Sequence, residues 1–198
     1  DVYKRQAVGS VMEVVEDLNL LMVRVNDNTI EAISLTDLSS VKTIDTTGIV
    51  YQKMTWDKEN CNLFLTGGGL NAKAVMYALD ISSGVITTYL DDNSLENNTS
   101  IISSSGHLLI LTTDPAFPNT TLRVQRWSTC GTVELLETIE TGIPITADFV
   151  NLLTLSEDEN GNFYITYISS GSPLTTITIF DKDFNEVYTK GIPASGIN

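Results

Sequence analysis

Short apolar runs, separated by turn-forming residues, follow one another along almost the whole chain. The runs are rich in Val, Ile, Leu, Thr and aromatic residues, which fit the pleated, half-buried surface of a β-sheet. Representative runs are LLMVRV, NLFLT, AVMYAL, LLILTT, LRVQRW, FYITYI and TTITIF. None is long enough, or spaced correctly, for an amphipathic helix. Only residues 11–18, VMEVVEDL, fit a helical stripe and, less cleanly, an outer strand. The pattern therefore predicts an all-β chain with one ambiguous segment.

The residues between the runs favour hairpin turns. Asn160-Gly161 lies between two apolar runs and is the strongest such signal, because both residues tolerate a positive φ. Residues 26–28, 82–84 and 130–131 occupy similar places between other runs. The strands are therefore expected to be antiparallel and joined by short connections.

The order of these elements repeats four times along the chain. Aligning the repeats brings Val41, Val85, Val133 and Val187 to the start of the last strand of each unit, with spacings of 44, 48 and 54 residues. A further short strand candidate precedes each core; these candidates are Val11–Glu16, Tyr51–Trp56, Thr99–Ser103 and Phe149–Leu155. Four antiparallel strands at this period are typical of the blades of a β-propeller.

The predicted fold is thus an all-β β-propeller, or partial propeller, of about four four-stranded antiparallel blades. The approximate blade bounds are residues 7–47, 48–93, 94–142 and 143–192. Stacked blades bury their inner strands on both faces, which explains the continuous apolar runs. The expected outermost strands, such as residues 132–139 and 186–190, are mixed and partly charged, as that position requires.

Two segments resemble repeats of known propeller families. MYALDISSGVITTYL resembles the strand–turn–strand of quinoprotein-like and YVTN-like repeats, in which an Asp precedes a small-residue turn and a Gly. DENGNFYITYI is similar to the opening of an NHL-type repeat. Quinoprotein repeats usually carry a Trp at the end of the outer strand, where Tyr89 stands here. Because of that departure, we expect no cofactor.

Charge and composition exclude some classes of partner. The chain has 11 Lys and Arg against 25 Asp and Glu, a net charge of −14, so it lacks the basic surface that binds nucleic acid or an anionic membrane. No stretch is long and apolar enough for a membrane-spanning helix, so no membrane insertion is expected. Apolar residues make up 42% and charged residues 18%. The remaining polar surface must be Ser, Thr and Asn, a composition common in exported β proteins, which predicts an extracellular or periplasmic location.

Few residues have the chemistry of a catalytic or metal site. His107 is the only histidine and begins an apolar run, which favours a structural role. Cys61 and Cys130 are too few for a zinc site, and a disulfide between them is left open. Residues 156–163, SEDENGNF, faintly resemble a calcium loop but offer too few oxygen ligands, so a hairpin turn is expected. The glycine run at residues 67–69 precedes a strand rather than a helix, and therefore predicts a connection and not a phosphate loop.

Propeller geometry indicates where a binding surface should lie. Loops from second to third strands, and from blade to blade, emerge on one face around the central channel. These loops are expected at residues 26–28, 67–72, 114–119, 171–173, 91–98 and 141–146. The candidate binding residues on them are Asn71, Asp91, Asp92, Asp114 and Phe117. Phe117 lies between two prolines, either as a contact anchor or folded back onto a neighbouring blade.

The leading functional hypothesis is a non-catalytic binding or scaffold module whose partner is a protein, a small molecule or a glycan. No convergent set of catalytic residues is visible in the sequence. The alternative is a piece of a propeller enzyme, such as a quinoprotein dehydrogenase, a lactonase or a glycan-active enzyme. Fold class alone does not decide between the two.

The first six residues, DVYKRQ, are the most basic hexapeptide in this acidic chain. They can be back-translated as gat gtg tat aag aga cag, which resembles the mosaic-end adapter of transposase-based sequencing libraries. We therefore expect residues 1–6 to be a sequencing scar and exclude them from the fold. The same observation predicts an assembled environmental fragment, with the native N-terminus, any signal peptide and earlier blades upstream.

Overall fold

The computed structural model describes residues 11–67, 74–92, 96–113, 121–129, 132–144, 154–168 and 174–193. These residues form four antiparallel sheets of four strands, in which neighbouring strands follow one another in the chain. The first sheet contains β1 (Met12–Val15), β2 (Leu20–Asn26), β3 (Thr29–Ser34) and β4 (Ser40–Asp45). The second contains β5 (Lys53–Asp57), β6 (Asn62–Gly67), β7 (Ala74–Leu79) and β8 (Ile86–Asp92). The third contains β9 (Glu96–Ile102), β10 (His107–Thr113), β11 (Thr121–Ser128) and β12 (Glu134–Pro144). The fourth contains β13 (Thr154–Glu157), β14 (Phe163–Ile168), β15 (Leu174–Phe180) and β16 (Glu186–Pro193).

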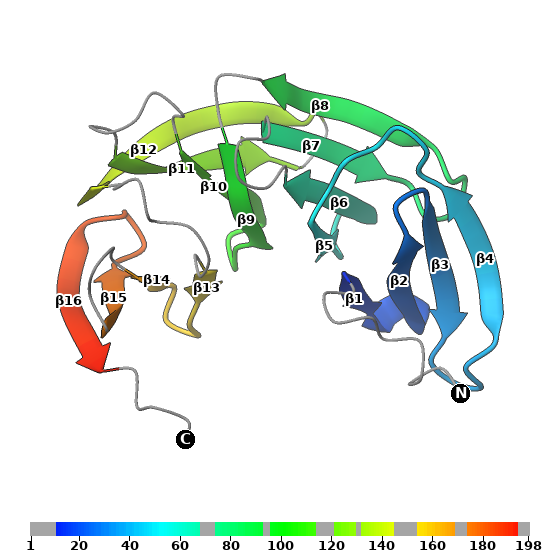
Figure 1. The fold of residues 1–198 in the computed structure, drawn as a ribbon, viewed down its shortest axis with the longest axis horizontal. Coiled ribbons are helices and arrows are strands. Elements are labelled where there is room, and N and C mark those ends of the chain that lie inside the picture. The colour runs from blue at the N-terminus through cyan, green and yellow to red at the C-terminus, as the bar shows by residue number, and fades with distance from the viewer. Residues whose placement is uncertain are drawn as a thin grey trace.

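The four sheets stand side by side around an arc (Figure 1). The first strand of each sheet lies nearest to the centre of the arc, and the fourth strand lies on its outer rim. This is the arrangement of blades in part of a β-propeller, so the predicted fold class is confirmed. Residues 1–6, the expected sequencing scar, lie outside the described residues.

The ambiguous segment at residues 11–18 is a strand followed by a single 3-10 turn, not an α-helix. β1 pairs with β2, and η2 (Glu16–Leu18) turns the chain between them. Asn19 ends the turn with a φ of 55°, a left-handed conformation that Asn adopts more readily than most residues. Val15 is fully buried against the second sheet. Packing between sheets therefore outweighs the helical stripe in this segment.

The hydrophobic core lies between the sheets, in one apolar cluster for each of the three junctions. Every side chain of β7 is buried, as its continuous apolar run predicts. On β6, Leu63 and Leu65 pack against the first sheet, whereas Phe64 packs against the third. Complete burial of a Phe side chain stabilises a fold by about 1.5–3 kcal/mol, and Phe64 is 0% exposed.

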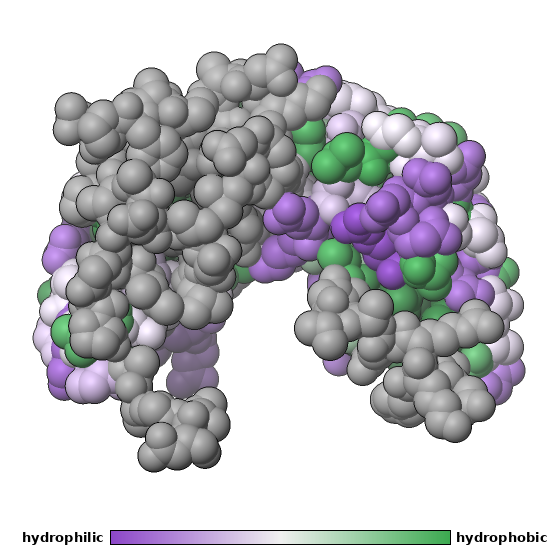
Figure 2. All heavy atoms as spheres, viewed as in Figure 1, coloured by the Kyte–Doolittle hydropathy of each residue, from purple (hydrophilic) through white to green (hydrophobic). Residues whose placement is uncertain are grey.

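The outermost strands are irregularly paired, and one of them is fully exposed. β16 is exposed along its whole length. The pairings β3–β4, β7–β8, β11–β12 and β15–β16 all contain a register shift. On the face turned towards the viewer in Figure 2, hydrophilic side chains gather in a continuous area over the first and second sheets. Each outermost pairing is therefore irregular, and the apolar clusters lie between the sheets.

Polar contacts join neighbouring sheets at one end of the strands. This is the end that carries the turn from the first to the second strand, and from the third to the fourth strand, of each sheet. Between the first two sheets, Lys42 Nζ donates to the carbonyl oxygens of Ile81 and Ser82, at 3.0 and 2.6 Å. Between the second and third, Asn60 Nδ2 donates to Thr129 Oγ1 at 3.1 Å. At the same end, hydrogen bonds between Ser104 and Glu157 join the third and fourth sheets, and both residues line a cleft.

Candidate functional site

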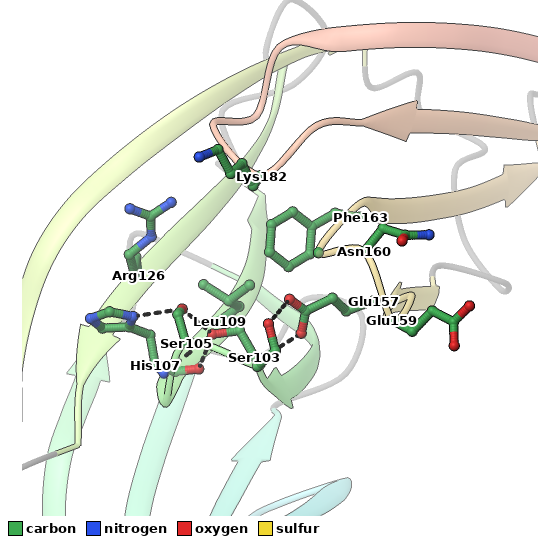
Figure 3. A pocket seen from close by; sticks show the side chains of 12 residues that line it. Ser103, Ser105, His107, Leu109, Arg126, Glu157, Glu159, Asn160, Phe163 and Lys182 are labelled. Carbon is green, nitrogen blue, oxygen red and sulfur yellow. Dashed lines mark hydrogen bonds between the residues drawn. The ribbon is translucent and has the colours of Figure 1, made fainter.

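A cleft of about 410 Å³ lies between the third and fourth sheets, and is named here the inter-sheet cleft. Its walls come from the β9–β10, β13–β14 and β15–β16 turns and from the adjoining strand ends (Figure 3). The lining residues are Ser103, Ser104, Ser105, His107, Leu109, Arg126, Glu157, Glu159, Asn160, Gly161, Phe163 and Lys182. Leu109 and Phe163 are buried apolar residues at its base, whereas the other side chains are polar or charged.

The wall from the third sheet is a hydrogen-bonded serine turn. Gly106 has a φ of 76°, and its N–H donates to the Ser103 carbonyl oxygen at 2.9 Å. The Ser105 hydroxyl lies 2.8 Å from Ser103 Oγ and 2.9 Å from His107 Nδ1. This network fixes the imidazole of the single histidine at the edge of the cleft.

The wall from the fourth sheet is the β13–β14 turn, organised by one carboxylate. Asp158 accepts hydrogen bonds from the backbone N–H and the side-chain amide of Asn162, both at 2.9 Å, and from Tyr164 Oη at 2.8 Å. The bonds from Asn162 are the main cause that lowers the pKa of Asp158 to about 2. Only Gly161 of the Asn160-Gly161 pair adopts a positive φ, of 80°. The hairpin-turn interpretation of residues 156–163 is thus confirmed. Among the described residues, no three His, Cys, Asp or Glu side chains come close enough to hold a metal ion.

One side chain crosses from wall to wall. Glu157 Oε2 accepts from the backbone N–H of Ser104 at 2.6 Å, and Oε1 accepts from the Ser104 hydroxyl at 2.7 Å. Both carboxylate oxygens are therefore engaged in holding the third sheet against the fourth.

Two cations lie on the other side of the cleft from Glu157, as Figure 3 shows for Arg126 and Lys182. Arg126 forms an ion pair with Glu137 at 2.5 Å. Its guanidinium carbon also lies 5.9 Å from the centre of the Phe184 ring, which stacks on Phe163 at 4.4 Å. The ion pair with Glu137 and the contact with the Phe184 ring together hold the Arg126 guanidinium in a fixed orientation.

A second group of polar residues lies between the inner strands of the first two sheets. Glu13 Oε1 accepts from the backbone N–H of Trp56 at 2.9 Å. Burial is the main cause that raises the pKa of Glu13 and lowers that of Lys53. Each shift favours the uncharged form of its side chain.

The structure revises the loop positions predicted from the sequence. Asp91 and Asp92 were expected in a loop between blades, but they are the last residues of β8, opposite Val75 and Ala74 of β7. The loop prediction is wrong there because β7–β8 pairing continues to the end of this segment. Residues 96–98 and 141–144 are likewise in strands and not in loops. Asn71, Asp114 and Phe117 lie outside the described residues.

The inter-sheet cleft lies at the end of the strands opposite to the predicted binding face. Sequence reasoning treated both of its main segments, residues 103–107 and residues 156–163, as turns and strand starts only. The available signal was the run of three serines just before the single histidine, together with a Glu beside a hairpin turn. Nothing in the sequence pairs the two segments, because the contact joins positions 53 residues apart. Among the described residues, no helix is long and apolar enough to cross a membrane.

Comparison with known proteins identifies the fold. No family model and no curated protein matches the chain. Among solved structures, it is similar to hydrazine synthase of Kuenenia stuttgartiensis, with 13% identity, a TM-score of 0.67, and coverage of 100% of this chain and 60% of that one. It is also similar to the endo-arabinase of Bacteroides thetaiotaomicron, with 13% identity, a TM-score of 0.54, and coverage of 95% and 81%. A quinoprotein alcohol dehydrogenase-like protein of the same species matches with 12% identity, a TM-score of 0.50, and coverage of 93% and 55%.

These neighbours are propeller-type proteins, and the resemblance to quinoprotein-like repeats is supported at the level of the fold. The chain spans 60% of the length of the hydrazine synthase chain. At such low identity the likeness concerns architecture alone, and function must be argued from the site.

Proposed function

We propose that the chain is a non-catalytic, ligand-binding β-propeller module, and that the inter-sheet cleft is its binding site. The observation that carries this proposal is the convergence of polar side chains from three turns and two sheets on one hollow of about 410 Å³. That volume lies in the range of about 300–1,000 Å³ typical of small-molecule sites. The lining is mostly polar and charged, with only Leu109 and Phe163 apolar, which favours a polar ligand.

The bonding of the cleft residues supports binding rather than turnover. The Ser105 hydroxyl and the His107 imidazole are two residues apart, and both belong to the hydrogen-bonded turn. A nucleophile and base of a hydrolase need a third group that orients the base. Among the described residues, no carboxylate hydrogen bond to His107 is found. Glu157 is instead bonded through both oxygens to Ser104.

The proposal includes a place outside the cytoplasm, in an exported or surface protein. It is supported by the composition, in which charged residues make up only 18% of the chain. A ligand there would be a small molecule, a glycan or an exposed part of another protein.

Titration with small ligands tests the site. Because His107 is the only histidine, its ring C–H signals report on the cleft directly in one-dimensional proton NMR of untagged protein. A panel of neutral and acidic sugars and amino acids should contain at least one compound that shifts these signals with saturation. Ser105→Tyr, which places a ring in the cleft, should abolish that binding, whereas Ser83→Tyr on the exposed β7–β8 turn should preserve it. Binding that is equal in both variants, or conversion of the ligand to a product, would overturn the proposal.

A propeller enzyme is the second candidate, favoured by the pair Glu13 and Lys53. Titratable groups whose pKa values move towards neutrality through burial are concentrated at active sites. If this pair carries a reaction, turnover should be lost in Glu13→Gln and in Lys53→Met but retained in Ser105→Tyr. Turnover that survives both of the first two substitutions would exclude this candidate.

A further inference from the structure

We infer that the inter-sheet cleft binds the oxyanion group of a small ligand, a carboxylate or a phosphate, between Arg126, Lys182 and His107. This inference rests on the proposed function, since it names the class of ligand for the same site.

Basic side chains are scarce in this chain, yet three of them line the cleft. The chain has only 11 Lys and Arg and one His among 198 residues. Arg126 extends from β11 of the third sheet, Lys182 from the β15–β16 turn of the fourth, and His107 from the start of β10. Three groups that bind anions therefore converge from separate elements, in a chain whose net charge is −14.

Arg126 is already oriented for an anion. A guanidinium has five N–H donors in a planar fork, and the ion pair with Glu137 engages Nη1. The Phe184 ring lies beside the same guanidinium, at 5.9 Å from its central carbon. An oxyanion in the cleft would thus meet a guanidinium that is held in place, which reduces the entropy lost on binding.

The carboxylates around the cleft leave the cationic side available. Both oxygens of Glu157 accept hydrogen bonds from Ser104, and the oxygens of Asp158 are engaged within their own turn. Figure 3 shows Glu157 and Glu159 on the side away from Arg126 and Lys182. Among the described residues, no ion pair is found for Lys182. Asp181, the neighbour of Lys182 in the chain, interacts with its charge, and Glu137 pairs with Arg126 through Nη1. A ligand oxyanion can bond to the remaining N–H donors of these two basic side chains.

Neutral hydrogen-bonding groups complete the lining. The Ser105 hydroxyl and the Asn160 side chain border the cleft, and both can bond to hydroxyl groups. A sugar that carries a carboxylate or a phosphate combines the two requirements. Galacturonate and galactose 6-phosphate are suitable probes, and galactose is the neutral control of the same shape.

Calorimetry and the His107 proton signals test this inference together, at pH 7 and low salt. Galacturonate or galactose 6-phosphate should bind at least about tenfold more tightly than galactose, since a charge-assisted hydrogen bond is roughly twice as strong as a neutral one. The better of the two anionic probes identifies whether carboxylate or phosphate is preferred. Arg126→Gln and Lys182→Gln should each weaken that probe by about tenfold or more.

Arg123→Gln is the matched control. Arg123 lies on the same strand and forms an ion pair with Glu140 at 2.6 Å, but it does not line the cleft. Its substitution should leave probe binding unchanged, and thermal unfolding should show that all three variants are folded. Lys182 is exposed, so its substitution is not expected to disturb the fold.

The outcomes separate this inference from the proposed function. If galactose binds as tightly as the anionic probes, and Ser105→Tyr abolishes its binding, the cleft is a ligand site but the oxyanion inference is wrong. The inference is also wrong if the anionic probes shift no His107 signal, or if Arg126→Gln and Lys182→Gln bind them as tightly as Arg123→Gln. Failure of the proposed function would instead appear as binding that Ser105→Tyr does not affect.

Discussion

Gly67, the last residue of β6, should tolerate no side chain. Its φ is 121°, and a Cβ added there would lie 2.8 Å from the backbone nitrogen of Gln52 and 2.9 Å from its Cβ. The Gln52 N–H donates to the Thr66 carbonyl oxygen at 2.8 Å, so the neighbouring backbone cannot withdraw without losing that bond. Gly67→Ala therefore combines an unfavourable φ, at about 1–2 kcal/mol, with a steric clash of about 1–3 kcal/mol.

A sum of about 3 kcal/mol corresponds to a fall in Tm of about 6–12 °C for a chain of this length. Gly142 offers a matched comparison, because its φ is 71° but a Cβ there would meet nothing within 4 Å. Gly142→Ala should cost about 1 kcal/mol, or about 2–4 °C. Thermal unfolding followed by circular dichroism measures both. Equal melting temperatures would show that the close approach of Gln52 to Gly67 does not contribute, and would refute the reasoning.

Three further predictions concern the acid response, the core and the free thiol. The bonds from Asn162 lower the pKa of Asp158 from an ordinary 3.8 to about 2, so its stabilising effect is present above pH 4 and is lost as the pH falls towards 2. The Tm of Asp158→Ala should accordingly fall less than the Tm of the wild type between pH 4 and pH 2. Parallel curves of Tm against pH for the two proteins would contradict this. Phe64→Ala should reduce the free energy of unfolding by about 3–5 kcal/mol in urea titrations. The Val187 side chain is 64% exposed, so Val187→Ala should change the free energy of unfolding by less than about 0.5 kcal/mol. Equal losses in Phe64→Ala and Val187→Ala would contradict this prediction. Cys61 is free and exposed, so a thiol reagent should modify it in the native protein, and Cys61→Ser should remove that reaction. A wild type that reacts only after reduction would indicate a disulfide instead.

The fold was predictable because its signals are local. Hairpin turns, strand composition and a repeating order of elements are all visible in a single sequence, and each blade is assembled from strands adjacent in the chain. Residues 11–18 were ambiguous because their periodicity alone does not reveal that Val15 would be buried against a neighbouring sheet. The end of β8 was mistaken for a loop because the polar residues Asp91 and Asp92 can end a strand as well as follow one.

The candidate site was not predictable in the same way. The contact between Ser104 and Glu157 depends on how the third sheet stands against the fourth, which no local pattern encodes. Arg126 and Lys182 line the same cleft only because a strand end in one sheet faces a turn in the next. Propeller geometry predicts a binding surface at the opposite end of the strands, because the loops around the channel emerge there. It does not indicate where side chains from neighbouring sheets line a common cleft.

The register shift in every outermost strand pairing bears on how these molecules behave in a crowded solution. An outer strand of a sheet presents unpaired N–H and C=O groups that can template the addition of a strand from another chain. A bulge increases the local twist and breaks the even spacing of those groups, so an incoming strand cannot pair with them over its full length. Strand β12, the longest of the described strands at 11 residues, contains two such shifts in its pairing with β11. The register shifts thus disfavour the addition of a strand from another molecule along the outer edges of the four sheets.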